Sequence, residues 1–180
     1  ATSFAGSNQH ITRAYDSDFD FIASQPFTIA TWFKHNTATA TETLITNMNT
    51  ADNDGGYKLK MESDGDITCE TDDDDADTTI DDTATTTLAT YDDNTWHHVA
   101  CVYDTTNTDL HIYIDGQLVI SDSSTTTNSL ANNDALFIGI NSATGTEDRI
   151  GQIDDTKIYR YPLNSTQIKL LYNENSAVRF

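Results

Sequence analysis

Hydrophobic and polar positions alternate along much of this chain, in short runs that polar turns separate. The clearest runs are Trp-His-His-Val-Ala-Cys-Val-Tyr (96–103), Leu-His-Ile-Tyr-Ile-Asp-Gly-Gln-Leu-Val-Ile (110–120), Leu-Phe-Ile-Gly-Ile (136–140) and Gly-Gln-Ile-Asp-Asp-Thr-Lys-Ile-Tyr-Arg-Tyr-Pro-Leu (151–163). A period of two residues is typical of strands that bury one face. The pattern therefore predicts antiparallel strands joined by tight turns.

The first half shows the same pattern. Phe27–His35 predicts a long strand with Phe27, Ile29, Thr31 and Phe33 on one face. Further strands are expected at 3–6, 10–13, 42–47, 57–62 and 66–71. Asp-Gly pairs at 64–65 and 115–116 predict hairpin turns. Residues 72–87 are a low-complexity stretch rich in Asp and Thr, which predicts a long surface loop or a weak edge strand.

One helix is expected after Pro162. Asn164 is its N-cap, and Gln167 stands three residues later, at capping-box spacing. Ile168, Leu171 and Tyr172 then form an apolar face. We expect this helix to end near residues 173–175.

Composition supports one all-β domain over residues 1–180. Asp outnumbers Glu by 24 to 5, and Thr is abundant; Asp favours loops, and Thr favours strands. Nine Lys and Arg residues oppose these acids, and the net charge of −20 argues against nucleic acid and anionic membrane surfaces as partners. Membrane insertion is not expected, since no apolar run approaches about 18 residues. The acidic excess has three interpretations: adaptation to salt, binding of divalent cations, or solubility.

The cysteines and the N-terminus say little about the compartment. Cys69 and Cys101 fall in predicted strands, and we expect two buried thiols; a disulfide requires that the two strands be neighbours. No signal peptide is visible at the start of the chain. Ala1 is compatible with removal of an initiator Met, signal cleavage or trimming.

Six segments, in order, resemble motifs of laminin-G-like and pentraxin-like domains of the concanavalin A-like lectin/glucanase superfamily. They are Phe4-Ala5-Gly6-Ser7-Asn8, Phe27-Thr28-Ile29-Ala30-Thr31-Trp32, Trp96-His97-His98-Val99-Ala100, Ile112-Tyr113-Ile114-Asp115-Gly116, Gly151–Tyr159, and Pro162-Leu163-Asn164 with Ile168. The resemblance implies a two-sheet antiparallel jelly-roll sandwich. Such domains usually bind a partner, often a glycan and often with calcium.

The resemblance gives these motifs structural roles. Trp32 and Trp96 are expected in the core or at its rim. His97 and His98 point to opposite faces of a strand, so we expect one of them to be buried and hydrogen-bonded. Pentraxins have a disulfide between the strands that correspond to the Phe27 and Trp96 motifs. Cys101 matches one cysteine of that disulfide, but Ala30 occupies the position of the other, so this bridge is missing here.

Two calcium sites are hypotheses from the resemblance. The first joins Asp52, Asn53 and Asp54 to a later loop with Asn141, Glu147 and Asp148, because calcium prefers carboxylate and amide oxygens on loops. The alternative is ordinary turn chemistry. The second brings Asp16 and Asp18 to Asp154 or Asp155; its alternative is salt bridges with Lys157 or Arg13, or hydrogen bonds to backbone amides.

The sequence favours binding over catalysis. Tyr57, Asn53 and Asn141 are the candidate sugar-binding residues, since lectin sites stack sugars on aromatic rings and hold hydroxyls with amides. The glutamates lack the one-strand pairing of jelly-roll glycosidases, and neither a Gly-x-Ser-x-Gly elbow nor a phosphate loop occurs, so no enzyme is expected.

The expected function is a lectin-like adhesion module that recognises carbohydrate through rim loops with calcium. The alternative is a structural decoration or fibre protein of a virion or another surface assembly, which makes protein–protein contacts. Both hypotheses imply an extracellular or particle-surface location, and both are compatible with a homo-oligomer.

Overall fold

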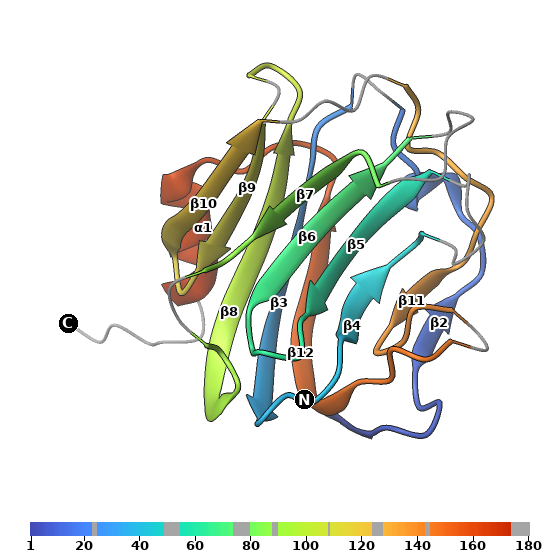
Figure 1. The fold of residues 1–180 in the computed structure, drawn as a ribbon. Coiled ribbons are helices and arrows are strands. Elements are labelled where there is room, and N and C mark those ends of the chain that lie inside the picture. Colours follow the sequence, from blue (N-terminus) through green and yellow to red (C-terminus); the bar gives the residue numbers. More distant parts are fainter. Residues whose placement is uncertain are drawn as a thin grey trace.

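The protein is a sandwich of two antiparallel sheets with one helix (Figure 1). The structure, a computed structural model, describes residues 1–22, 25–48, 55–73, 80–87, 90–107, 109–123, 128–142 and 145–173. Each sheet has six strands over these residues. The predicted all-β jelly-roll sandwich with a short C-terminal helix is therefore confirmed.

The first sheet contains the long strands whose sequences resemble the laminin-G-like motifs. In spatial order its strands are β1 (Thr2–Ala5), β12 (Ile150–Tyr159), β3 (Phe27–Asn36), β8 (Asp93–Asp104), β9 (Asp109–Ile114) and β10 (Gln117–Ser123). The expected hairpin joins β9 to β10, and its residues Asp115 and Gly116 have positive φ angles of 50° and 77°. Asp-Gly suits such a turn because glycine adopts positive φ without steric cost.

The second sheet is built mostly from the middle of the chain. Its strands, in spatial order, are β2 (Ile11–Arg13), β11 (Leu136–Ile138), β4 (Glu42–Thr46), β5 (Gly56–Met61), β6 (Ile67–Asp72) and β7 (Asp82–Thr85). Strand β7 lies at the edge, which confirms the edge-strand interpretation for its part of the acidic stretch. A 3₁₀ turn (Ser17–Phe19) lies between β2 and β3, where a loop or bulged edge was expected.

The core lies between the inner faces of the two sheets. Phe27, Ile29, Thr31 and Phe33 are all buried there, as the alternation in β3 predicts. The Thr31 hydroxyl is satisfied by Thr156, whose Oγ1 lies 2.8 Å from Thr31 Oγ1.

A disulfide between Cys69 and Cys101 crosses this core, so the expectation of two free thiols is wrong. Cys69 belongs to β6 and Cys101 to β8, and both are fully buried. The two strands are not neighbours in a sheet; they face each other across the sandwich, with the two Cα atoms 6.3 Å apart. That separation is within the usual range for a bridge.

Helix α1 (Ser165–Asn173) packs on the outward face of the first sheet. Asn164 Oδ1 accepts from the backbone N–H groups of Thr166 and Gln167, and Gln167 Oε1 accepts from Asn164 N, which confirms the predicted capping box. Ile168 is buried against Ala30 and Ala100. No helix in the described ranges is long and apolar enough to cross a membrane.

The two adjacent histidines of β8 divide the expected roles between them. His98 is buried, and burial lowers its pKa to about 4. Its Nδ1 has no hydrogen-bond partner among the described residues. His97 instead makes the hydrogen bonds, with Asp115 Oδ2 at 2.8 Å and Asp93 Oδ1 at 3.2 Å. The prediction of one buried and hydrogen-bonded histidine therefore fits His97 best, whose side chain is 14% exposed.

Candidate functional site

The outward face of the second sheet carries a cluster of charged side chains, which we call the lysine–glutamate face. Its members are Lys58, Lys60, Glu62, Glu70 and Glu147. Strand β5 places the two lysines there because its alternate residues, Tyr57, Leu59 and Met61, are buried in the core. Glu70 is the register partner of Lys58 on β6.

Each lysine lies between two carboxylates. Lys60 Nζ is 2.7 Å from Glu70 Oε1 and 3.1 Å from Glu62 Oε1. Lys58 Nζ is 3.9 Å from Glu70 Oε2 and 3.7 Å from Glu147 Oε2. Only 12% of the Lys58 side chain, 14% of Lys60 and 9% of Glu70 is exposed. These charges are therefore largely desolvated although they lie on an outward face.

The network favours the charged forms of Lys60 and Glu62. Burial opposes the charge of Lys60, but the hydrogen bonds and charges of Glu70 and Glu62 outweigh it and raise the pKa of Lys60. Burial also opposes the charge of Glu62, yet the Thr41 hydroxyl and Lys60 hold the pKa of Glu62 below its usual value. At neutral pH the face presents ammonium donors beside carboxylate acceptors.

Threonine hydroxyls complete the lysine–glutamate face. Thr43, Lys60, Thr68 and Thr85 are paired in register across β4, β5, β6 and β7, so they form one row on it. Thr43 Oγ1 donates to Glu147 Oε2 at 2.6 Å, and the Thr68 and Thr85 hydroxyls are 3.0 Å apart. Thr43 and Thr68 are buried, so their hydroxyls hold Glu147 and Glu62 in place.

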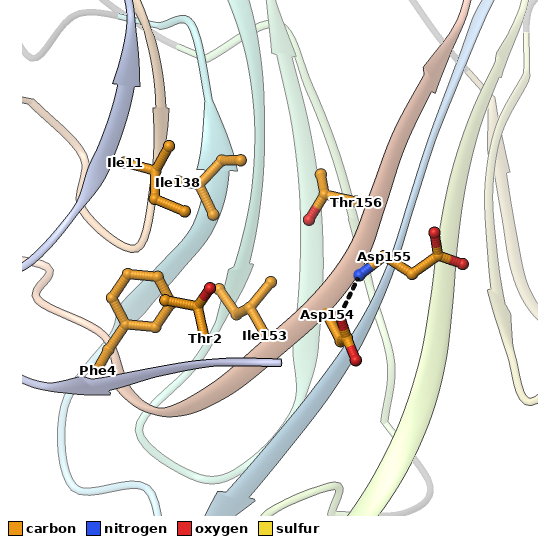
Figure 2. A pocket seen from close by; sticks show the side chains of 8 residues that line it. All are labelled: Thr2, Phe4, Ile11, Ile138, Ile153, Asp154, Asp155 and Thr156. Atoms are coloured by element: carbon orange, nitrogen blue, oxygen red, sulfur yellow. Dashed lines mark hydrogen bonds between the residues drawn. The ribbon is translucent and has the colours of Figure 1, made fainter.

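A cleft of about 180 Å³ opens at the edge of the sandwich (Figure 2). It is lined by Thr2, Phe4, Ile11, Ile138, Ile153, Asp154, Asp155 and Thr156. The β12 bulge after Asp154 places Asp155 at a positive φ of 50°. In Figure 2 the Thr156 side chain lies toward the cleft, whereas the Asp155 carboxylate points away from it. The lining of the cleft is thus mixed, with Phe4 and three isoleucines beside two threonines and two aspartates.

The structure describes only part of the first predicted calcium site. Asp52, Asn53 and Asp54 lie outside the described residues. In the later loop, Asp148 Oδ1 accepts from Asn8 N at 2.9 Å, and the buried Asn141 accepts from Thr146 N at 3.2 Å. Glu147 turns toward Lys58 on the lysine–glutamate face. A calcium ion between these two loops stays a prediction.

The residues of the second predicted calcium site have other contacts. Asp16 pairs with Arg13 at 2.9 Å, as the salt-bridge alternative proposed. Asp18 lies 3.6 Å from Arg160, and Asp154 Oδ1 accepts from Asp155 N at 3.0 Å. The described part of the chain contains no group of three His, Cys, Asp or Glu residues arranged to hold a metal ion.

Tyr57 lies in the core and not at the rim, where a sugar-binding residue was expected. Its side chain is fully buried, and its ring packs 5.6 Å from that of Phe21 and 5.2 Å from that of Phe27. The sequence interpretation missed Lys58 and Lys60, which follow Tyr57 on β5. The alternation Tyr-Lys-Leu-Lys-Met at 57–61 was the signal that could have placed both lysines on one face.

Comparison with known proteins identifies the same fold elsewhere. The binding domain of Paraclostridial Mosquitocidal Protein 1 superposes with a TM-score of 0.76 at 18% identity, over 97% of this chain and 43% of that one. The CBM40 of the Ruminococcus gnavus IT-sialidase gives 0.67 at 16% identity, over 92% and 99%. A heptameric SAP-like pentraxin from Limulus polyphemus gives 0.66 at 15% identity, over 94% and 80%.

These likenesses establish the fold, and the family comes from the sequence. The chain spans about two fifths of the toxin binding domain. A search of curated proteins found no match. The sequence model described as "Concanavalin A-like lectin/glucanases superfamily" matches residues 5–169. The chain therefore belongs to the laminin-G-type family of the concanavalin A-like lectin/glucanase superfamily.

Proposed function

We propose that this protein is a non-catalytic carbohydrate-binding module whose ligand lies on the lysine–glutamate face. The observation that carries the proposal is the pair of largely desolvated lysines, each between two carboxylates, on an outward sheet face. Structures with this fold support it: one is described as a toxin binding domain, and the CBM40 was solved bound to α2,3 sialyllactose. The place of such a module is the surface of a cell or particle.

The energetics of the lysine–glutamate face favour recognition over stability. Desolvated ion pairs contribute little net stability, because the cost of removing charges from water offsets their attraction. A ligand hydroxyl can accept from an ammonium and donate to the adjacent carboxylate, so a lysine–glutamate pair fits a sugar hydroxyl.

Calcium assistance is part of the proposal. Glu147 belongs both to the predicted calcium loop and to the lysine–glutamate face, where it lies 3.7 Å from Lys58. A calcium ion bound by Asp52, Asn53 and Asp54 together with Asp148 would fix this loop beside the ligand. Calcium would then raise glycan affinity and thermal stability together.

Glycan-array binding with and without millimolar calcium tests this function. We expect a glycan signal that Lys60→Met abolishes and that Lys169→Met, on the exposed surface of α1, leaves unchanged. Near-UV circular dichroism confirms that both variants are folded. The proposal fails if the wild-type protein binds no glycan in either condition, or if Lys60→Met binds as the wild type does.

A further inference from the structure

A second surface, on the opposite sheet, has the composition of a separate binding site. Gln152, Lys34 and Trp96 are paired in register across β12, β3 and β8, so their side chains form one row on the outward face of the first sheet. We call them the Trp96 row. Trp96, one of the two tryptophans in the chain, is 37% exposed. An exposed indole beside a lysine and an amide is suited to stacking on a sugar.

The Trp96 row borders a crevice of about 250 Å³. The crevice is lined by Lys34, His35, Asn36, Asn94, Ile150, Gly151 and Gln152. Three of these residues offer side-chain amides. Gly151 has a φ of 118°, and a Cβ at this position would collide with the Lys34 carbonyl oxygen. Glycine is therefore required where β12 and β3 approach each other at the crevice.

A buried ionic cluster lies behind the crevice. His35 Nδ1 is 2.5 Å from the Ile150 carbonyl oxygen, and Nε2 is 3.4 Å from Glu42 Oε1. Arg149 Nη1 donates to Glu42 Oε2 at 2.8 Å, and Ile150 N donates to the same oxygen. His35, Glu42 and Arg149 are all buried.

This geometry assigns one proton of His35. A carbonyl oxygen can only accept, so Nδ1 carries a proton. Nε2 has no hydrogen-bond partner among the described residues. Arg149 is the buried cation that pairs with the carboxylate of Glu42.

Two cationic groups beside the crevice have unused hydrogen-bonding capacity. Arg149 Nε finds no acceptor within the described part of the chain, and Lys34 adds a further cation at the surface. The carboxylates of Asp93 and Asp92 bind elsewhere: Asp93 to Thr95 and His97, and Asp92 to the Ala38 backbone N–H. A buried donor without a partner and an ammonium beside it both favour an anionic acceptor. The crevice is thus a favourable place for an anion on a chain of net charge −20.

We propose that the Trp96 row and its crevice bind a sugar that carries a carboxylate. The sugar ring stacks on Trp96, its carboxylate pairs with Lys34, and the amides of Gln152 and Asn94 take its hydroxyls. This site is separate from the lysine–glutamate face, which lies on the other sheet.

Titration calorimetry with three ligands tests the chemistry. Glucuronate is the acidic sugar, glucose its neutral counterpart and acetate the bare carboxylate. We expect glucuronate to bind, glucose and acetate to bind at least roughly tenfold more weakly, and glucuronate binding to weaken as salt is raised. Equal binding of glucose, or of acetate, overturns the proposal.

Variants locate the site. Lys34→Met and Gln152→Ala should each weaken glucuronate binding, by roughly tenfold for the lysine. Trp96→Phe keeps an aromatic ring and should bind, yet lose the ligand-induced change in tryptophan fluorescence. Lys169→Met is the matched charge control. Unchanged affinity in Lys34→Met overturns this site, whereas loss of glycan binding only in Lys60→Met leaves the proposed function intact.

Discussion

Removal of the Cys69–Cys101 disulfide is the sharpest test of how the two sheets are held together. The bridge links β6 of the second sheet to β8 of the first, and both sulfur atoms lie in the main core. We consider two perturbations: reduction of the wild-type protein, which removes only the cross-link, and the double variant Cys69→Ala/Cys101→Ala, which also removes core volume.

The magnitude follows from the loop that the bridge closes. The cysteines are 32 residues apart in sequence. The chain-entropy relation for a loop of this length gives a stabilisation of about 4 kcal/mol. Reduction should cost this much, and the double variant somewhat more, because truncation of two fully buried side chains leaves space that the core does not refill.

Urea unfolding monitored by circular dichroism measures both effects. With a slope of about 2 kcal/mol per molar urea, loss of the bridge should lower the midpoint by about 2 M. Free thiols counted under denaturing, non-reducing conditions give an independent check, and the wild-type protein should show none. Two free thiols, or identical midpoints for the oxidised and reduced protein, would refute the cross-sheet bridge.

Two further predictions concern the helix cap and a histidine. Replacement of Asn164 by Ala should lower the free energy of unfolding by about 1 kcal/mol, because it removes the acceptor for two backbone N–H groups of α1; thermal unfolding measures this, and no change would contradict the cap. The Asp115 hydrogen bond outweighs burial and raises the pKa of His97. The stabilisation from the His97 imidazolium is therefore complete below its ordinary pKa and is lost as pH rises through the raised value. Relative to His97→Gln, the wild-type protein should lose stability as the pH rises above the ordinary histidine pKa of about 6.5 and through the raised pKa of His97, and a pH-independent stability difference between the two proteins would contradict the shift.

The sequence predicts those features whose signal is local. Alternation over Phe27–Phe33 identifies the buried face of β3, and the spacing of Asn164 and Gln167 identifies the helix start, because both patterns arise within one element. The disulfide was missed for the opposite reason. Its formation depends on how two sheets face each other, and the sequence argument considered only strands that are neighbours in a sheet.

The candidate site shows the same division. Alternation in β5 alone places Lys58 and Lys60 on one face, and Glu62 follows Lys60 by two residues, so these three members of the lysine–glutamate face were available locally. The other two acids, Glu70 from the next strand and Glu147 from far along the chain, were not. A search for paired carboxylates on one strand cannot find them, because sheet register, rather than sequence spacing, brings them together.

The outward face of the first sheet holds one tryptophan under the helix and leaves the other exposed. Where α1 covers this face, the sheet presents small or apolar residues such as Ala30 and Ala100, and Trp32 stacks on Tyr172 of the helix with ring centroids 5.5 Å apart. Two residues further along β3, Lys34 and Trp96 share the next row, and Trp96 is left 37% exposed. A side chain of this size gains most from burial, so the exposed indole retains apolar area that a partner can cover. The proposed ligand, which stacks on the indole and carries a negative charge, would supply a contact to Trp96 and to Lys34 at once.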